Sequence, residues 1–136
     1  MPQKRPDRTL GGPHDAFWDW CARGELRLQT CTSCGHRTWP PVEACEACGS
    51  GELDWQRMSG RGRIASWCTF ERDYYYGTLP LPYDTILVEL EEGPLFLSNP
   101  AGFTRQEIEI GMPVALTFVD AEDSAGPFRL PVFAKG

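Results

Sequence analysis

Two pairs of cysteines constrain the fold of this chain more than any other feature of its sequence. CTSCG at 31–35 and CEACG at 45–49 place two CxxC motifs ten residues apart. Two cysteines on one tight turn can bind the same cation, and the glycine after each pair suits a turn that requires a positive φ. The spacing therefore predicts a tetrahedral site with four sulfur ligands: Cys31, Cys34, Cys45 and Cys48.

A site made of four thiolates favours zinc or iron over harder cations. We expect one structural Zn²⁺, and the ligand set alone leaves iron in a rubredoxin-like site as the alternative. Disulfides would need an oxidising compartment, and residues 1–15 lack the apolar stretch of a secretory signal. Neither pair has the βαβ context of a redox CxxC motif. Four protein ligands leave no open position for a catalytic water, so we expect no chemistry at the metal.

The other cysteines and the histidines are expected to have structural roles. Cys21 falls on the apolar side of a predicted helix and Cys68 falls in a predicted strand, so both are expected to be small core residues. His36 follows a glycine of the first cysteine pair and is expected at the surface. His14 is expected near the start of the helix.

The N-terminal part of the chain predicts a short helix followed by a zinc ribbon. Residues 1–13 are rich in Pro and Gly and are expected to form a flexible leader. HDAFWDWCARG at 14–24 predicts a helix that Asp15 caps, that Gly24 ends and whose apolar residues recur at helical spacing. Short strands before and after the cysteines complete a module over 14–59.

Residues 60–136 predict a small β domain. Five segments have the length and the β-branched or aromatic content of strands: 63–70, 85–91, 94–99, 114–120 and 128–134. A polar stretch at 101–113 is expected to form one helical turn, and 120–126 is expected to form an acidic loop. Five short strands with a helical insert after the third match the order of an OB-fold barrel.

The charge argues against a nucleic-acid partner. Lys and Arg number 13 and Asp and Glu number 19, which gives a net charge of −6. Binding to a phosphate backbone relies on clustered basic residues, so a single-stranded nucleic-acid-binding module is only the alternative reading. A zinc-stabilised interaction scaffold unrelated to CoA is a third reading. No apolar run approaches the roughly 20 residues that span a bilayer, and we expect a cytoplasmic protein.

The order of the motifs resembles one known family. FWDWCARGELRLQTC, the two CxxCG pairs, GRGRIASWCTF, LSNPAG, EIEIGMPVALTF and LPVFA follow one another across residues 16–134. This order is similar to that of the zinc-ribbon/OB-fold proteins, long catalogued as a domain of unknown function, that accompany thiolase-like and other acyl-CoA enzymes. The resemblance implies a mainly β fold, in which an N-terminal helix and a rubredoxin-like zinc ribbon precede a five-stranded OB-fold barrel.

The resemblance also implies an accessory role beside a catalytic partner. Family members are similar to subunits of thiolases, acyltransferases and steroid side-chain retro-aldolases, in which the thiolase-like chain supplies the catalytic groups. The small protein is expected to support assembly and to help hold the CoA-linked substrate. Some members are fused to a hydratase-like domain, whereas we expect this chain to be free-standing. The acyl group, the partner's reaction and the stoichiometry are left open.

An aromatic segment at 71–84 departs from the family pattern. Tyr74, Tyr75 and Tyr76 lie in a loop interrupted by Gly and Pro, where consecutive rings cannot all point into one core. They predict either a cover over the barrel or a partner interface or tunnel wall, because tyrosine suits surfaces that are partly apolar and partly wet. No nucleophile and base occur in a recognisable arrangement, so we expect no independent catalysis.

Overall fold

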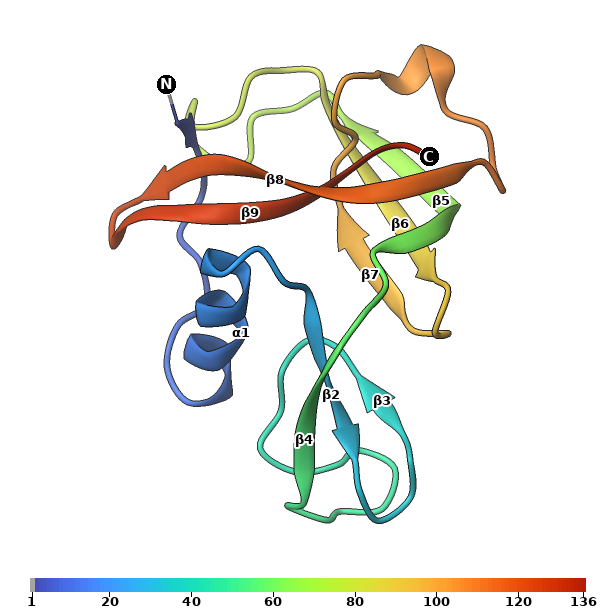
Figure 1. Cartoon of the computed structure of the whole chain (residues 1–136). Coiled ribbons are helices and arrows are strands. Elements are labelled where there is room, and N and C mark those ends of the chain that lie inside the picture. Colours follow the sequence, from blue (N-terminus) through green and yellow to red (C-terminus); the bar gives the residue numbers. More distant parts are fainter. Residues whose placement is uncertain (1) are drawn as a thin grey trace.

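The computed structural model describes residues 2–136 and consists mainly of β-strands with one short helix at the N-terminal end (Figure 1). No helix among these residues is long and apolar enough to cross a membrane. The elements are β1 (Gln3–Lys4), α1 (Pro13–Ala22), β2 (Arg27–Cys31), β3 (Arg37–Thr38), β4 (Leu53–Arg57), β5 (Arg61–Phe70), β6 (Tyr83–Leu90), β7 (Leu95–Ser98), the 3-10 turn η1 (Arg105–Glu107), β8 (Pro113–Asp123) and β9 (Gly126–Lys135).

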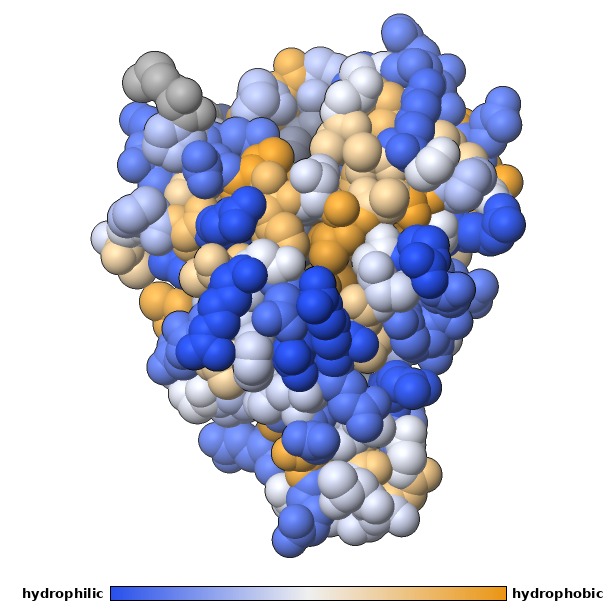
Figure 2. All heavy atoms as spheres, in the orientation of Figure 1, coloured by the Kyte–Doolittle hydropathy of each residue, from blue (hydrophilic) through white to orange (hydrophobic). Residues whose placement is uncertain are grey.

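The strands form two sheets that divide the chain into a ribbon and a larger β domain. The ribbon contains β3, β2 and β4 in that order, all antiparallel to their neighbours. The larger sheet has the order β1-β8-β5-β6-β7, and β9 pairs with β8. Figure 1 shows the ribbon projecting below the larger sheet, with α1 lying beside the β8–β9 hairpin. Figure 2 shows apolar side chains gathered mainly over the sheet part, while the ribbon end is largely hydrophilic.

The larger sheet has the expected strands and the expected helical turn, but it is not closed into a barrel. Strand β5 pairs with β8 only through Arg61, Gly62 and Arg63, near its beginning. Between the end of β7 and strand β9 there is one isolated parallel bridge, from Pro100 to Phe133. The predicted mainly β fold, with a helix and a zinc ribbon before a five-stranded OB-fold, is therefore confirmed, and the OB-fold sheet is open.

Side chains from both parts of the chain fill the core. Ile86, Val88 and Phe133 of the larger sheet are fully buried. From α1, Phe17 and Cys21 join the same cluster, as their helical spacing predicted. Leu28 of β2 and Leu26, which lies just before that strand, are also buried in it. The ribbon and the sheet therefore share one core instead of having two separate ones.

The expected flexible leader is corrected by the structure for most of its length. Gln3 and Lys4 pair in parallel with Ala121 and Glu122 of β8. Farther along, Arg8 forms an ion pair with Asp123, at 2.7 Å between Nε and Oδ2. Met1 lies outside the described residues. The segment is thus an edge strand followed by a strap, residues 5–8. Sequence patterns miss both because their partners on β8 lie more than 110 residues away.

The expected acidic loop at 120–126 is mostly strand. Strand β8 continues to Asp123 and β9 begins at Gly126, so two residues form the turn. Ala121 is fully buried and Asp123 is covered by Arg8. The charges of this stretch suggested a loop, but they alternate with residues that face the protein, as in a half-buried strand.

Two smaller expectations are also corrected. Gly12 occupies the N-cap position of α1, and Asp15 lies in the first turn, where its Oδ1 accepts a hydrogen bond from the Gly11 N–H at 2.9 Å. Cys68 is exposed, not part of the core, because it lies in the half of β5 beyond the pairing with β8. The end of α1 is as expected: it stops at Ala22, and Gly24 has a φ of +78°.

Candidate metal centre and aromatic cleft

The two cysteine pairs fold into turns with the same hydrogen-bond pattern. In the first turn, the Gly35 N–H donates to the Cys31 carbonyl at 2.8 Å and the Cys31 N–H donates to the His36 carbonyl at 2.9 Å. The second turn repeats both bonds, from Gly49 to Cys45 and from Cys45 to Ser50. Gly35 and Gly49 each have a φ of +80°, a conformation that glycine adopts without strain.

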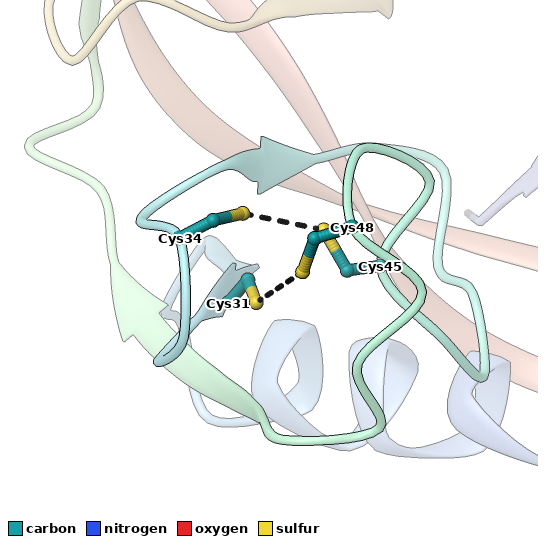
Figure 3. Close-up of side chains that lie close together, drawn as sticks. All are labelled: Cys31, Cys34, Cys45 and Cys48. Atoms are coloured by element: carbon teal, nitrogen blue, oxygen red, sulfur yellow. Dashed lines mark hydrogen bonds between the residues drawn. The ribbon is translucent and has the colours of Figure 1, made fainter.

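These turns bring the four predicted ligands together at the tip of the ribbon (Figure 3). All four Sγ atoms lie within 4.8 Å of one another, and the Cys31–Cys48 and Cys34–Cys45 sulfurs are 3.6 Å apart. Zn–S bonds of about 2.3 Å in a tetrahedron require sulfurs about 3.8 Å apart. A disulfide would require about 2.05 Å. The geometry fits a four-coordinate metal, which these cysteines would hold.

The chemistry of the donors also fits a dication. The Cys34 backbone N–H is the main cause that lowers the pKa of Cys31 to about 6. The N–H of His36 lowers the pKa of Cys34, but burial and the neighbouring thiols outweigh it and raise that pKa to about 12. Four thiolates this close repel one another, and Zn²⁺ removes the repulsion and lets all four ionise.

The remaining cysteines and histidines stay outside the cluster. Cys21 lies in the last turn of α1 and is fully buried, and burial raises the pKa of its thiol to about 12. Cys68 lies on the surface of the sheet. His36 is at the surface as predicted, with Nε2 3.1 Å from Glu46 Oε1. Because Glu46 belongs to the second cysteine turn, this contact links the two turns without supplying a ligand.

The three tyrosines of the loop before β6 have different surroundings. Tyr76 is completely exposed and has a φ of +51°. Tyr74 is 63% exposed, and the edge of its ring meets Phe70 with the centroids 6.2 Å apart. Tyr75 is partly covered and lines a cavity beneath the loop. The loop is thus both an exposed aromatic surface and one wall of a cavity.

That cavity has a volume of about 420 Å³, and we call it the aromatic cleft. It lies where the N-terminal strap, α1, the ribbon and the open side of the sheet meet. Eight of its nineteen lining residues are aromatic: Phe17, Trp18, Trp39, Phe70, Tyr75, Tyr83, Phe96 and Phe128. The tyrosine loop alone suggested such a wall, and Tyr75 does line the cleft. The other walls could not be predicted, because Trp39 stands between the cysteine pairs and the pattern of residues 1–13 predicts a flexible leader. Only the regular spacing of Phe17 marked one wall residue as inward-facing.

Carboxylates of the β8–β9 turn do not form a catalytic group. Asp123 accepts hydrogen bonds from the Arg8 side chain and from backbone N–H groups. Arg8 is the main cause that lowers the pKa of Asp123 to about 2. Within residues 2–136 no hydrogen bond joins a histidine ring to a serine or cysteine side chain. These contacts hold the strap in place and do not activate a nucleophile.

The comparisons with known proteins fit this arrangement. Residues 18–54 match the family model for the rubredoxin-like zinc ribbon domain of ChsH2, and residues 55–119 match the model for its C-terminal OB-fold domain. A DUF35 domain-containing scaffold protein of Methanothermobacter thermautotrophicus is 33% identical over 97 residues, which are 71% of this chain and 73% of the relative. The chain belongs to the DUF35 family. As a zinc-ribbon member of it, the chain has one structural zinc site.

Two further relatives are named as parts of enzymes. A probable enoyl-CoA hydratase alpha subunit of Thermomonospora curvata is 34% identical over 88% of this chain. The DUF35 chain spans 36% of that relative's length. Among solved structures, a chain of an Ltp2-ChsH2(DUF35) aldolase superposes with a TM-score of 0.82 at 29% identity. That match covers 95% of this chain and 98% of the aldolase chain.

Proposed function

We propose that this chain is an accessory subunit of a CoA-linked enzyme, binding a thiolase-like catalytic chain and helping it to hold an acyl-CoA substrate. The observation that carries the proposal is the end-to-end match with the DUF35 chain of an aldolase, in which both chains are covered almost completely. The relative named as a hydratase alpha subunit supports the same class of role. The acyl group and the partner's reaction are not specified by this chain.

The chemistry of the chain supports a non-catalytic role. Four of its six cysteines form the candidate zinc site and Cys21 is fully buried. Cys68 is exposed, but no base is hydrogen-bonded to it among the described residues. Nucleophilic catalysis needs an activated nucleophile with a base in reach. Zinc held at the ribbon tip would fix the two cysteine turns and would supply no open coordination position.

The aromatic loop is the surface that we assign to the partner. Tyr74, Tyr76 and Leu81 are all exposed on this one segment. Burying large apolar side chains lowers the free energy of a protein, so a cluster of exposed ones often marks an interaction site. Tyrosine is common at interfaces because it offers a large apolar area with a polar end. Because the Tyr76 side chain is completely exposed, contact with a partner could bury nearly all of its surface.

The test is co-expression with the thiolase-like protein encoded nearest to it in its genome. We expect a stable complex by size-exclusion chromatography with light scattering, and a lower affinity after Tyr76→Ala. Leu95→Ala is the matched control, because Leu95 is also exposed but lies at the far end of the β6–β7 hairpin. If no complex forms with any thiolase-like chain, the proposed function is wrong. If Leu95→Ala weakens the complex as much as Tyr76→Ala, the loop is not the interface.

A further inference from the structure

Two buried polar atoms in the wall of the aromatic cleft have no hydrogen-bond partner. They are the indole Nε1 of Trp39 and the hydroxyl Oγ1 of Thr85. Thr85 is more than nine-tenths buried. Leaving a buried donor unpaired costs free energy, and such atoms are uncommon in folded proteins. A ligand oxygen is one way to satisfy either atom, because an indole N–H can only donate and a hydroxyl can donate or accept.

The aromatic rings that line the cleft pack against one another. Trp39 packs against Phe96 with ring centroids 4.5 Å apart, and Phe17 packs against both. Trp18 meets Phe128 edge to face at 5.3 Å. A volume of about 420 Å³ lies within the range of small-molecule sites, which typically combine aromatic walls with a few polar groups. The cleft is therefore suited to a compact apolar body.

The charges around the cleft are balanced, which disfavours an ionic ligand. Arg8 is paired with Asp123, and its guanidinium lies 4.1 Å from the Phe128 ring centroid. Arg5 donates to the Tyr83 hydroxyl at 2.6 Å, and the Asp7 carboxylate accepts from the Ser124 N–H. One arginine and one aspartate are thus left without an ionic partner, and their charges cancel. An added carboxylate would gain from Arg5 but would be repelled by Asp7.

We infer that the aromatic cleft is a binding site for a neutral, compact, largely apolar molecule that carries one carbonyl oxygen. The apolar body lies among the aromatic rings, and the carbonyl accepts a hydrogen bond from Trp39 Nε1 or from Thr85 Oγ1. Tyr75 closes one side of the site from the aromatic loop. All of these residues belong to this chain, so binding does not require the partner of the proposed function.

The experiment uses the zinc-loaded full chain, labelled with ¹⁵N and titrated with the bicyclic ketone 2-decalone. The chain has five tryptophans, and the indole cross-peak that disappears in Trp39→Phe identifies Trp39. We expect that peak to move downfield and saturate as the ketone is added. We also expect Trp39→Phe to weaken binding about threefold to tenfold, and Thr85→Val to weaken it less, because each removes one neutral hydrogen bond.

Trp67→Phe is the matched control, since Trp67 is on the sheet and does not line the cleft. It should bind 2-decalone within about twofold of the wild type. The site is refuted if the Trp39 peak does not respond up to the solubility limit of the ketone. It is also refuted if Trp39→Phe, with an otherwise native spectrum, binds as well as Trp67→Phe. Saturable binding of decanoate in place of the ketone would refute the neutral ligand.

Discussion

The cysteine turns of the ribbon and the open sheet are stabilised by different interactions, a metal site in the first and a hydrophobic core in the second. Between β2 and β4 the ribbon has one strand of two residues, and its turns are organised around four sulfurs. The sheet contains no metal ligand and instead buries large side chains such as Ile86, Phe96 and Phe133. A short, loop-rich segment cannot bury enough apolar surface to offset its conformational entropy, so a metal is expected to hold it.

Loss of a zinc ligand should have the largest effect on stability, and it should affect the ribbon tip much more than the sheet. Cys31→Ser should release the metal and unfold the tip of the ribbon, because metal binding contributes about 10–16 kcal/mol in small zinc modules. Metal content and amide hydrogen exchange would measure this. The amides of β6, including Ile86 and Val88, should keep their protection. If they lose it together with the ribbon, the two parts form one cooperative unit.

Removal of a core ring is the reverse experiment. Phe96 is buried and its ring lies near those of Phe17, Trp39 and Phe133. Phe96→Ala should lower the free energy of unfolding by about 3–5 kcal/mol. The metal content should stay at one per chain, since the sulfurs are held by their own turns. Loss of zinc from this variant would contradict the separation of a metal-held ribbon from a core-held sheet.

The strap adds a third, electrostatic contribution to the sheet. Arg8 lowers the pKa of Asp123 from its usual 3.8 to about 2, so the folded state favours the charged carboxylate. The resulting stability, roughly 2 kcal/mol, is fully present well above pH 3.8 and is lost as the pH falls towards 2. The stability difference between wild type and Asp123→Asn should therefore shrink over that range. Comparing the two proteins at each pH cancels the effect of acid on the metal site. A difference that does not change with pH would show that the ion pair is not its cause.

The cysteines outside the ribbon give the smallest effects and test the ligand assignment. Cys68→Ser should change the free energy of unfolding by less than about 0.5 kcal/mol, since the side chain is exposed. Cys21→Ser should cost about 1–3 kcal/mol, because it buries a hydroxyl in the core. Both variants should retain one metal per chain in elemental analysis. Metal loss from either would overturn the assignment of the four ribbon cysteines.

The ribbon could be predicted from the sequence because its determinants are local. Cys31 and Cys34, with Gly35 after them, specify a turn by themselves, and the second pair repeats it. The five strands after residue 60 were likewise visible in runs of β-branched and aromatic residues. Their positions agree with the structure within a few residues, apart from the longer β8 and β9.

What could not be predicted depends on contacts between distant segments. Lys4 joins the sheet through Glu122, and no local pattern marks two polar residues as a strand. The open edge of β5, which exposes Cys68, results from where β8 stops pairing, and alternation within β5 does not reveal it. The aromatic cleft needs Trp39 from the ribbon and Thr85 from the sheet, so it exists only after the two parts have packed together.

The proposed role of this chain, as the accessory partner of a thiolase-like enzyme, can be tested by enzyme turnover. The most direct measurement is acyl-CoA turnover by the zinc-loaded chain alone, by the neighbouring thiolase-like chain alone, and by both together. We predict no turnover by this chain alone and a large gain when it is added to the thiolase-like chain, with the gain reduced by Tyr76→Ala. Equal turnover with and without this chain, or turnover by this chain alone, would show that it is not an accessory subunit of that enzyme.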